Sequence, residues 1–66
     1  MYSLIDLSTY TRLEWTTDKH LIHEWAERWS RRNPEVHFAV RLTDSERFVA
    51  VYRNGQSVKF EQTRVG

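Results

Sequence analysis

Histidines and carboxylates cluster in one stretch of the chain, where such side chains can hold a metal ion or exchange protons. His20, His23, Glu24 and Glu27 are close in sequence, and helical spacing of three or four residues brings such groups onto one face. The order His-Leu-Ile-His-Glu matches neither the H-E-x-x-H zinc pattern nor its H-x-x-E-H inversion. Even with His37 added, these residues also fit ordinary solvated neighbours on a helix. We therefore expect no metal site and no cofactor.

Residues for nucleophilic catalysis are also missing. The sequence has no cysteine, no G-x-S-x-G pattern and no glycine-rich phosphate loop, since its glycines are Gly55 and Gly66. Asp44-Ser45-Glu46 is typical of a turn. A chain of 66 residues is also short for the concave pocket that enzymes of small molecules use. We therefore expect a protein that is not an enzyme.

Size and composition indicate one small domain with a dense aromatic core. The chain has no cysteine for disulfides, so 14% aromatic residues or association with another chain must reinforce the core. The formal net charge is +1, whereas non-specific nucleic-acid binding normally needs a strongly basic surface. The first ten residues lack the basic and apolar regions of a signal peptide, and no stretch is long enough to span a membrane. These features favour a cytoplasmic location.

One amphipathic helix is predicted from Asp18 to Arg32. Apolar residues recur with the helical period at positions 21, 22, 25, 26 and 29. Thr17 is the expected N-cap, and Asn33-Pro34 should end the helix because a residue before proline avoids helical geometry. Opposite charges four residues apart should pair on the solvent side, Glu24 with Arg28 and Glu27 with Arg31. Trp25 and Trp29 should pack against a sheet, with helix-mediated dimerisation as the alternative.

The second half of the chain predicts a three-stranded antiparallel meander. Residues 36–42 alternate apolar and polar side chains, residues 47–53 form the next strand, and residues 57–63 form the last one. Residues 43–46 supply the first turn, and Asn54-Gly55 predicts a tight type I′ turn.

The two turns together predict a pairing register. They place Val40 opposite Val49, Phe38 opposite Val51, and Val51 opposite Val58. In this register one apolar face lies against the helix. Its members are Val36, Phe38, Val40, Leu42, Val49, Val51, Val58 and Phe60.

The N-terminal segments are rich in β-formers and predict one or two more strands, at residues 2–7 and 9–15. Leu13 and Trp15 should share a face of the second segment, and Trp15 should pack over the start of the helix. The expected fold class is therefore α+β, with one amphipathic helix packed on an antiparallel sheet of the C-terminal meander and the N-terminal strands.

The sheet face turned away from the helix, the outer face, is the candidate binding surface. The predicted register brings five residues onto it: His37, Arg41, Phe48, Tyr52 and Lys59. Aromatic side chains beside basic ones anchor many protein interfaces, and they also stack unpaired bases. In a third interpretation the N-terminal segment covers this face and makes it part of the core.

We therefore expect a small protein-binding module of the inhibitor or adaptor kind, which docks a macromolecular partner through the outer face or a strand edge. Short proteins of this kind often come from phages or mobile elements. The alternatives are a nucleic-acid-binding module that stacks single-stranded bases on the sheet aromatics, and a homodimer in which a second copy fills the face or edge. A membrane partner is not expected.

Overall fold

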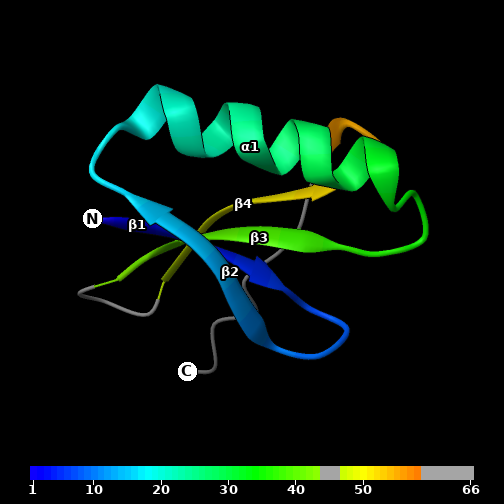
Figure 1. Ribbon diagram of the computed structural model, residues 1–66, viewed down its shortest axis with the longest axis horizontal. Helices are drawn as coiled ribbons and strands as arrows, with labels where there is room; N and C mark the ends of the chain where they lie inside the picture. The colour runs from blue at the N-terminus through cyan, green and yellow to red at the C-terminus, as the bar shows by residue number, and fades with distance from the viewer. Residues whose placement is uncertain (44–46, 59–66) are drawn as a thin grey trace, which may run out of the picture.

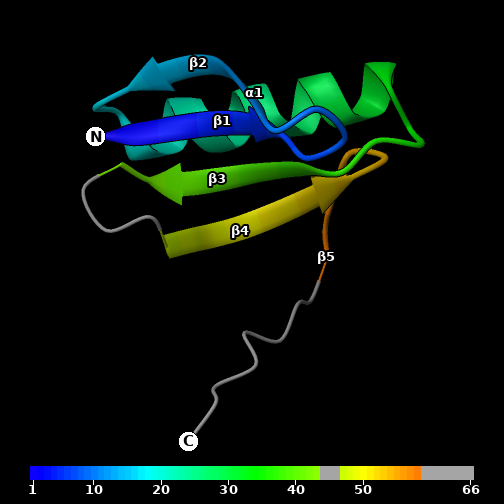
Figure 2. The same ribbon diagram turned by 90° about the horizontal axis from the view of Figure 1, so that it is seen from below.

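The computed structural model describes residues 1–43 and 47–58. In chain order the elements are β1 (Tyr2–Asp6), β2 (Thr11–Thr16), α1 (Lys19–Arg32), β3 (Phe38–Leu42), β4 (Arg47–Arg53) and β5 (Gln56–Val58). The strands form one antiparallel sheet in the order β2-β1-β3-β4-β5, and α1 lies across one of its faces (Figure 1, Figure 2). The predicted α+β class is confirmed, and both N-terminal segments are strands within the sheet.

The helix begins directly after a capping side chain, that of Asp18. Oδ1 of Asp18 accepts hydrogen bonds from the backbone N–H of His20 at 2.9 Å and of Leu21 at 3.1 Å. Asp18 is therefore the N-cap, and the prediction of Thr17 was one residue early. A carboxylate at this position satisfies the orphan donors of the first turn and suits the positive end of the helix dipole.

The solvent side of α1 carries the expected ion pairs. Arg28 pairs with Glu24 at 3.0 Å, and Arg31 pairs with Glu27 at 2.7 Å. Asn33 follows as the C-cap. These exposed pairs each contribute only a few tenths of a kcal/mol, about 0.3–0.5, so packing of the opposite face supplies most of the stabilisation of the helix.

The main core lies between α1 and the sheet. Its buried members are Leu4, Ile22, Ala26, Phe38, Val40 and Ala50, and Tyr2, Leu13, Trp25, Trp29, Val36 and Tyr52 pack around them. The rings of Trp29 and Phe38 contact each other with centroids 6.2 Å apart. Trp25 and Trp29 thus pack against the sheet, as their helical spacing predicts.

A β-bulge in β4 is the main departure from the predicted register. At the turn end of the β3–β4 hairpin, Arg41 pairs with Phe48 as expected. The register then shifts by one residue, so that Val40 lies opposite Ala50 instead of Val49. Because side chains alternate with a period of two, one extra residue moves the later side chains of β4 to the other face.

The bulge makes three members of the predicted helix-facing set wrong: Val49, Val51 and Val58. Val51 and Val58 belong to a second apolar cluster on the outer face, and Val49 is 43% exposed. Ala50 and Tyr52 take the positions beneath the helix. The alternation in β3 was predicted correctly, whereas in β4 the extra residue reverses it beyond Val49.

The Asn54-Gly55 turn connects β4 to β5 and docks on the helix. Both residues have positive φ, 53° and 79°, as a type I′ turn requires, and the predicted β4–β5 register is confirmed. The backbone N–H of Gly55 donates to Oγ of the buried Ser30 at 2.8 Å. A Cβ on Gly55 would lie 2.5 Å from Cγ of Arg31, so the close approach needs glycine. The rest of the predicted last strand, including Phe60, lies outside the described residues.

A second bulge interrupts the pairing of β1 with β2. The register shifts between Leu4 and Ile5, which leaves Leu13 without a partner. Leu13 packs toward α1, whereas Trp15 pairs with Ser3 on the outer face and is 56% exposed. The predictions that Leu13 and Trp15 share a face, and that Trp15 covers the start of the helix, are therefore wrong.

Replacement of Phe38 by alanine should unfold most of the protein. The ring is 1% exposed and lies at the centre of the main core, so Phe38→Ala should lower the free energy of unfolding by about 3–5 kcal/mol. A domain of this size has about 3–5 kcal/mol to lose. Val49→Ala, at the exposed bulge, is the matched control and should melt close to the parent. Circular dichroism melts that rank the two variants in the opposite order would contradict this core.

Candidate functional site

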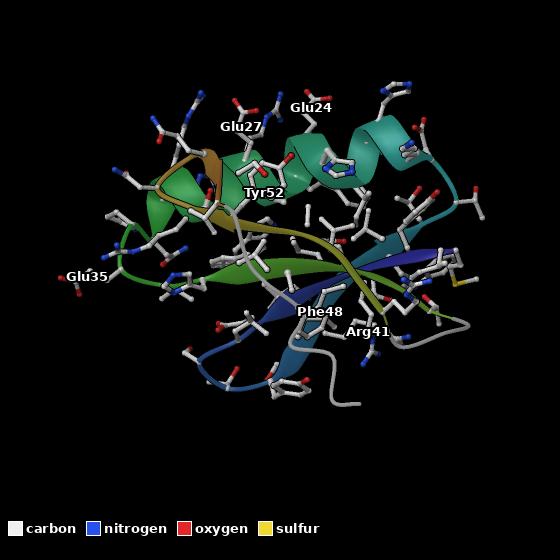
Figure 3. All side chains as sticks on the ribbon, turned by 180° about the vertical axis from the view of Figure 1, so that it is seen from behind. Glu24, Glu27, Glu35, Arg41, Phe48 and Tyr52 are labelled. Atoms are coloured by element: carbon white, nitrogen blue, oxygen red, sulfur yellow. The ribbon has the colours of Figure 1, made fainter. Side chains whose placement is uncertain are left out.

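The five residues predicted to bind a partner do not share one face. Arg41 and Phe48 are cross-strand neighbours on the outer face, and both are half-buried (Figure 3). His37 is exposed and lies just before β3. Tyr52 lies on the helix side, so its assignment to the outer face was wrong. Lys59 lies outside the described residues.

Tyr52 instead contacts the helix through His23. Its hydroxyl lies 2.8 Å from Nδ1 of His23, and the two rings meet edge to face with centroids 5.8 Å apart. Burial lowers the pKa of His23, and the nearby Lys19 and His20 lower it further. Burial also raises the pKa of Tyr52, as does the charge of Glu27. The pair is a structural contact that the bulge in β4 makes possible.

One row of side chains crosses the outer face from β2 to β4. Trp15 pairs with Ser3, Ser3 pairs with Arg41, and Arg41 pairs with Phe48. Two aromatic residues thus stand on either side of an arginine, with a buried serine between Trp15 and Arg41. Sequence reasoning missed Trp15, because the bulge at Leu13 decides which face it occupies and no residue pattern reveals that bulge.

Arg41 has an unsatisfied donor in the middle of this row. Its Nε is buried and has no hydrogen-bond partner among the described residues. The neighbouring Ser3 hydroxyl is engaged elsewhere, since its Oγ lies 3.0 Å from Oγ1 of Thr43. A buried donor without a partner costs about 1–3 kcal/mol, and a carboxylate oxygen is its strongest acceptor.

Beside the row lies the second apolar cluster. Ile5, Ala39 and Val51 are its buried members, with exposed fractions of 2%, 0% and 6%, and Leu7, Phe48 and Val58 pack against them. The described part of the chain places no helix over this face. Since the buried members are nearly inaccessible, a partner would contact the larger residues around them, Leu7, Phe48 and Val58.

The charged residues of the outer face are all arginines in the described strands. Arg12 is there because it pairs with Ile5, and Arg53 is there because it follows Val51 by two residues. Arg41 lies between them in the sheet order. The carboxylates of Glu14, Glu24 and Glu27 lie on the helix side or on the helix itself. The described part of the outer face is therefore cationic, although the net charge of the chain is only +1.

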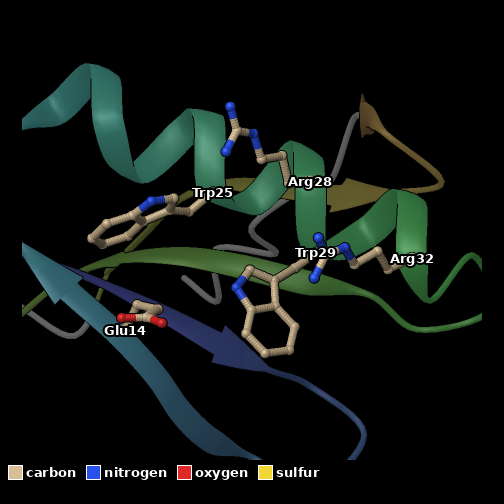
Figure 4. A pocket seen from close by; sticks show the side chains of 5 residues that line it. All are labelled: Glu14, Trp25, Arg28, Trp29 and Arg32. Carbon is tan, nitrogen blue, oxygen red and sulfur yellow. The ribbon is translucent and has the colours of Figure 1, made fainter.

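A groove of about 190 Å³ opens on the other face, between α1 and β2 (Figure 4). Its lining residues are Glu14, Trp25, Arg28, Trp29 and Arg32. The indoles of Trp25 and Trp29 are half-buried: one side of each packs against the core, and the other side lines the groove. The guanidinium of Arg28 is paired with Glu24. This groove has no pair of groups arranged for proton transfer or nucleophilic attack.

The described part of the chain shows neither a metal site nor a membrane-spanning helix. Residues 1–43 and 47–58 contain no group of three or more metal-ligating side chains. Their one helix is too short and too polar to cross a membrane.

Comparisons of the chain with protein-family models, with curated proteins and with solved structures found no match. Because a small α+β fold does not imply a function, the site itself has to indicate one.

The His23–Tyr52 contact should make the fold sensitive to mild acid. The folded pKa of His23 is below its ordinary value of 6.5, so as the pH falls through that value the unfolded chain binds the proton first. The free energy of unfolding should therefore be highest above pH 6.5 and should decrease as the pH falls below it. Urea denaturation across this range measures the slope.

His23→Gln should flatten that slope, whereas His20→Gln, at an exposed position of the same helix, should keep most of it. Equal slopes for the parent chain and His23→Gln would show that this histidine is not the responsible group.

Proposed function

We propose that this chain is a non-enzymatic protein-binding module, of the inhibitor or adaptor kind, that docks an acidic surface of a partner protein through its outer face. The row of Trp15, Arg41 and Phe48 is the observation that carries the proposal. The absence of cysteine agrees with a cytoplasmic setting.

The residue types of the row are those that supply most binding energy at protein interfaces. Tryptophan and arginine are enriched among the residues that cost most when truncated, and aromatic residues are enriched in interfaces generally. Trp15 is 56% exposed although it is the largest side chain of β2, and leaving such a ring in water has no folding advantage. A partner that covers the indole would bury this apolar area.

The charge of the face indicates the chemistry of the partner. Arg12, Arg41 and Arg53 surround an apolar centre, which is the usual anatomy of an interface with a polar rim. Arg41 is half-buried, so a carboxylate of the partner that pairs with its guanidinium would make a charge-assisted contact. The matching surface is therefore an apolar area with at least one acidic residue at its border.

Single-stranded nucleic acid is the second candidate, since an exposed tryptophan among arginines also fits a stacked base and its phosphates. The spacing disfavours it. Trp15 and Phe48 stand three strand intervals apart, about 14 Å at ~4.8 Å per interval, and the positions between them hold Ser3 and Arg41 instead of a stacking ring. The same experiment separates the two candidates.

Reversal of one charge on the outer face should weaken partner binding. Affinity capture from the cells that express the chain identifies the bound protein, and calorimetry with the purified pair measures the dissociation constant. Arg41→Glu should raise this constant by at least about tenfold, because it removes the donor and places a like charge before an acidic partner. Phe48→Ser should have a similar effect through lost contact area.

Arg47→Glu is the matched control, since Arg47 is exposed on the neighbouring strand but faces the helix side through its pairing with Leu42. It should bind like the parent. A partner that binds Arg41→Glu and the parent equally would contradict the proposal. Binding to single-stranded RNA or DNA that weakens steeply with salt, with no protein captured, would favour the second candidate.

A further inference from the structure

Strand β2 lies at one end of the sheet, and among the described residues no strand pairs with its other edge, here called the open edge (Figure 2). It is six residues long and contains neither proline nor lysine, whereas β5 at the other end has three described residues. Natural proteins usually protect an edge of this length with proline, lysine or a bulge, because its unpaired N–H and C=O groups can pair with another chain. Here the protection consists of the bulge at Leu13 and the charged side chains of Arg12 and Glu14.

The ladder of β1 shows which groups of β2 are unpaired. At the two ends of β1, Thr43 donates to the carbonyl of Met1 and Leu7 donates to the carbonyl of His37, both at 3.0 Å. Odd-numbered residues of β1 therefore direct their backbone groups to β3, and even-numbered residues direct theirs to β2.

The β2 residues that lie opposite odd-numbered residues of β1 therefore direct their backbone N–H and C=O groups away from β1, toward the open edge. These residues are Arg12, opposite Ile5, and Trp15, opposite Ser3. Each presents one N–H and one C=O at the open edge.

The bulge sets the spacing of these outward groups. In a regular antiparallel strand the residues that bond to one neighbour are two apart. In β2 the extra residue makes Arg12 and Trp15 three apart. A regular strand of another protein therefore cannot match both at once, whereas an antiparallel copy of β2 offers the same spacing in reverse.

We propose that β2 pairs antiparallel with β2 of a second copy of this chain, about a twofold axis that passes between Leu13 and Glu14. Arg12 then lies opposite Trp15 of the second copy, and each pair exchanges two backbone hydrogen bonds. Both side chains lie on the outer face, so each guanidinium stands beside an indole and can make a cation–π contact. On the helix side Leu13 lies opposite Glu14 of the second copy, and Thr11 lies opposite Thr16.

The helix side of the molecule fits the same arrangement. A twofold axis perpendicular to the sheet keeps both helices on the same side, next to the joined edges. The groove lined by Trp25 and Trp29 opens beside β2, so the second copy would add its own half-buried indoles along this groove. The two sheets become one, and the two arginine-lined outer faces become continuous.

Sedimentation equilibrium of the parent chain over a dilution series tests the proposal. We expect a mass that rises from 8.0 kDa toward twice that value as the concentration increases. Trp15→Lys should raise the dimer dissociation constant by at least about tenfold, since it removes two cation–π contacts and places two like-charge pairs across the edge. Trp15 is exposed, so the variant should keep the circular dichroism spectrum of the parent.

A charge exchange tests the register itself. The double variant Arg12→Glu, Trp15→Lys places opposite charges across the edge and should dimerise more tightly than Trp15→Lys alone. Tyr10→Lys, which adds the same charge at an exposed residue of the β1–β2 turn, should dimerise like the parent.

A parent chain that stays at 8.0 kDa at the highest concentration would overturn the proposal, and so would a double variant that binds itself no better than Trp15→Lys. The proposal does not rest on the docking of an acidic protein. Arg41→Glu should lose that partner and keep the dimer, so the two can fail separately.

Discussion

The extra residue in β4 is the constraint on which the rest of the molecule depends. Without Val49 as a bulge, Tyr52 would face outward and could not reach His23, and Ala50 would not lie beneath the helix. The bulge therefore places a small residue where α1 approaches the sheet and a hydrogen-bonding ring where the helix offers a histidine. Phe48 precedes the bulge and keeps its place on the outer face opposite Arg41, as the regular register predicts.

The bulge in β2 has an equivalent effect at the other end of the sheet. It turns Leu13 into the core and Trp15 out of it, and it sets the spacing of the backbone groups at the open edge. Bulges are frequent at sheet edges and next to functional sites, because they re-aim side chains without interrupting the sheet. In this chain the bulge in β2 places Trp15 on the face that carries the arginines, where Phe48 lies opposite Arg41. Binding of a partner protein and pairing with a second copy would both depend on the position of Trp15 on this face.

Much of the fold was predictable from local patterns. The helix follows from apolar residues at the 3.6-residue period, and the Asn54-Gly55 turn follows from the need for positive φ at two positions. Both hairpin registers were right near their turns. The faces of Tyr52 and Trp15 were not predictable, because a bulge inserts one residue without a distinctive sequence and reverses the alternation beyond it. For the candidate site, sequence reasoning therefore found Arg41 and Phe48, included Tyr52 wrongly and missed Trp15.

Nuclear Overhauser contacts across the β3–β4 hairpin test this account most directly, because they report which side chains share a face without any mutation. The bulge predicts contacts from the Ala50 methyl group to Val40 and to the helix, and from the Tyr52 ring to His23, with the Phe48 ring close to Arg41 on the opposite face. Contacts that instead join Val49 to Val40 and to the helix, with the Tyr52 ring on the same face as Phe48, would show a regular hairpin. That result would contradict the arrangement of both faces.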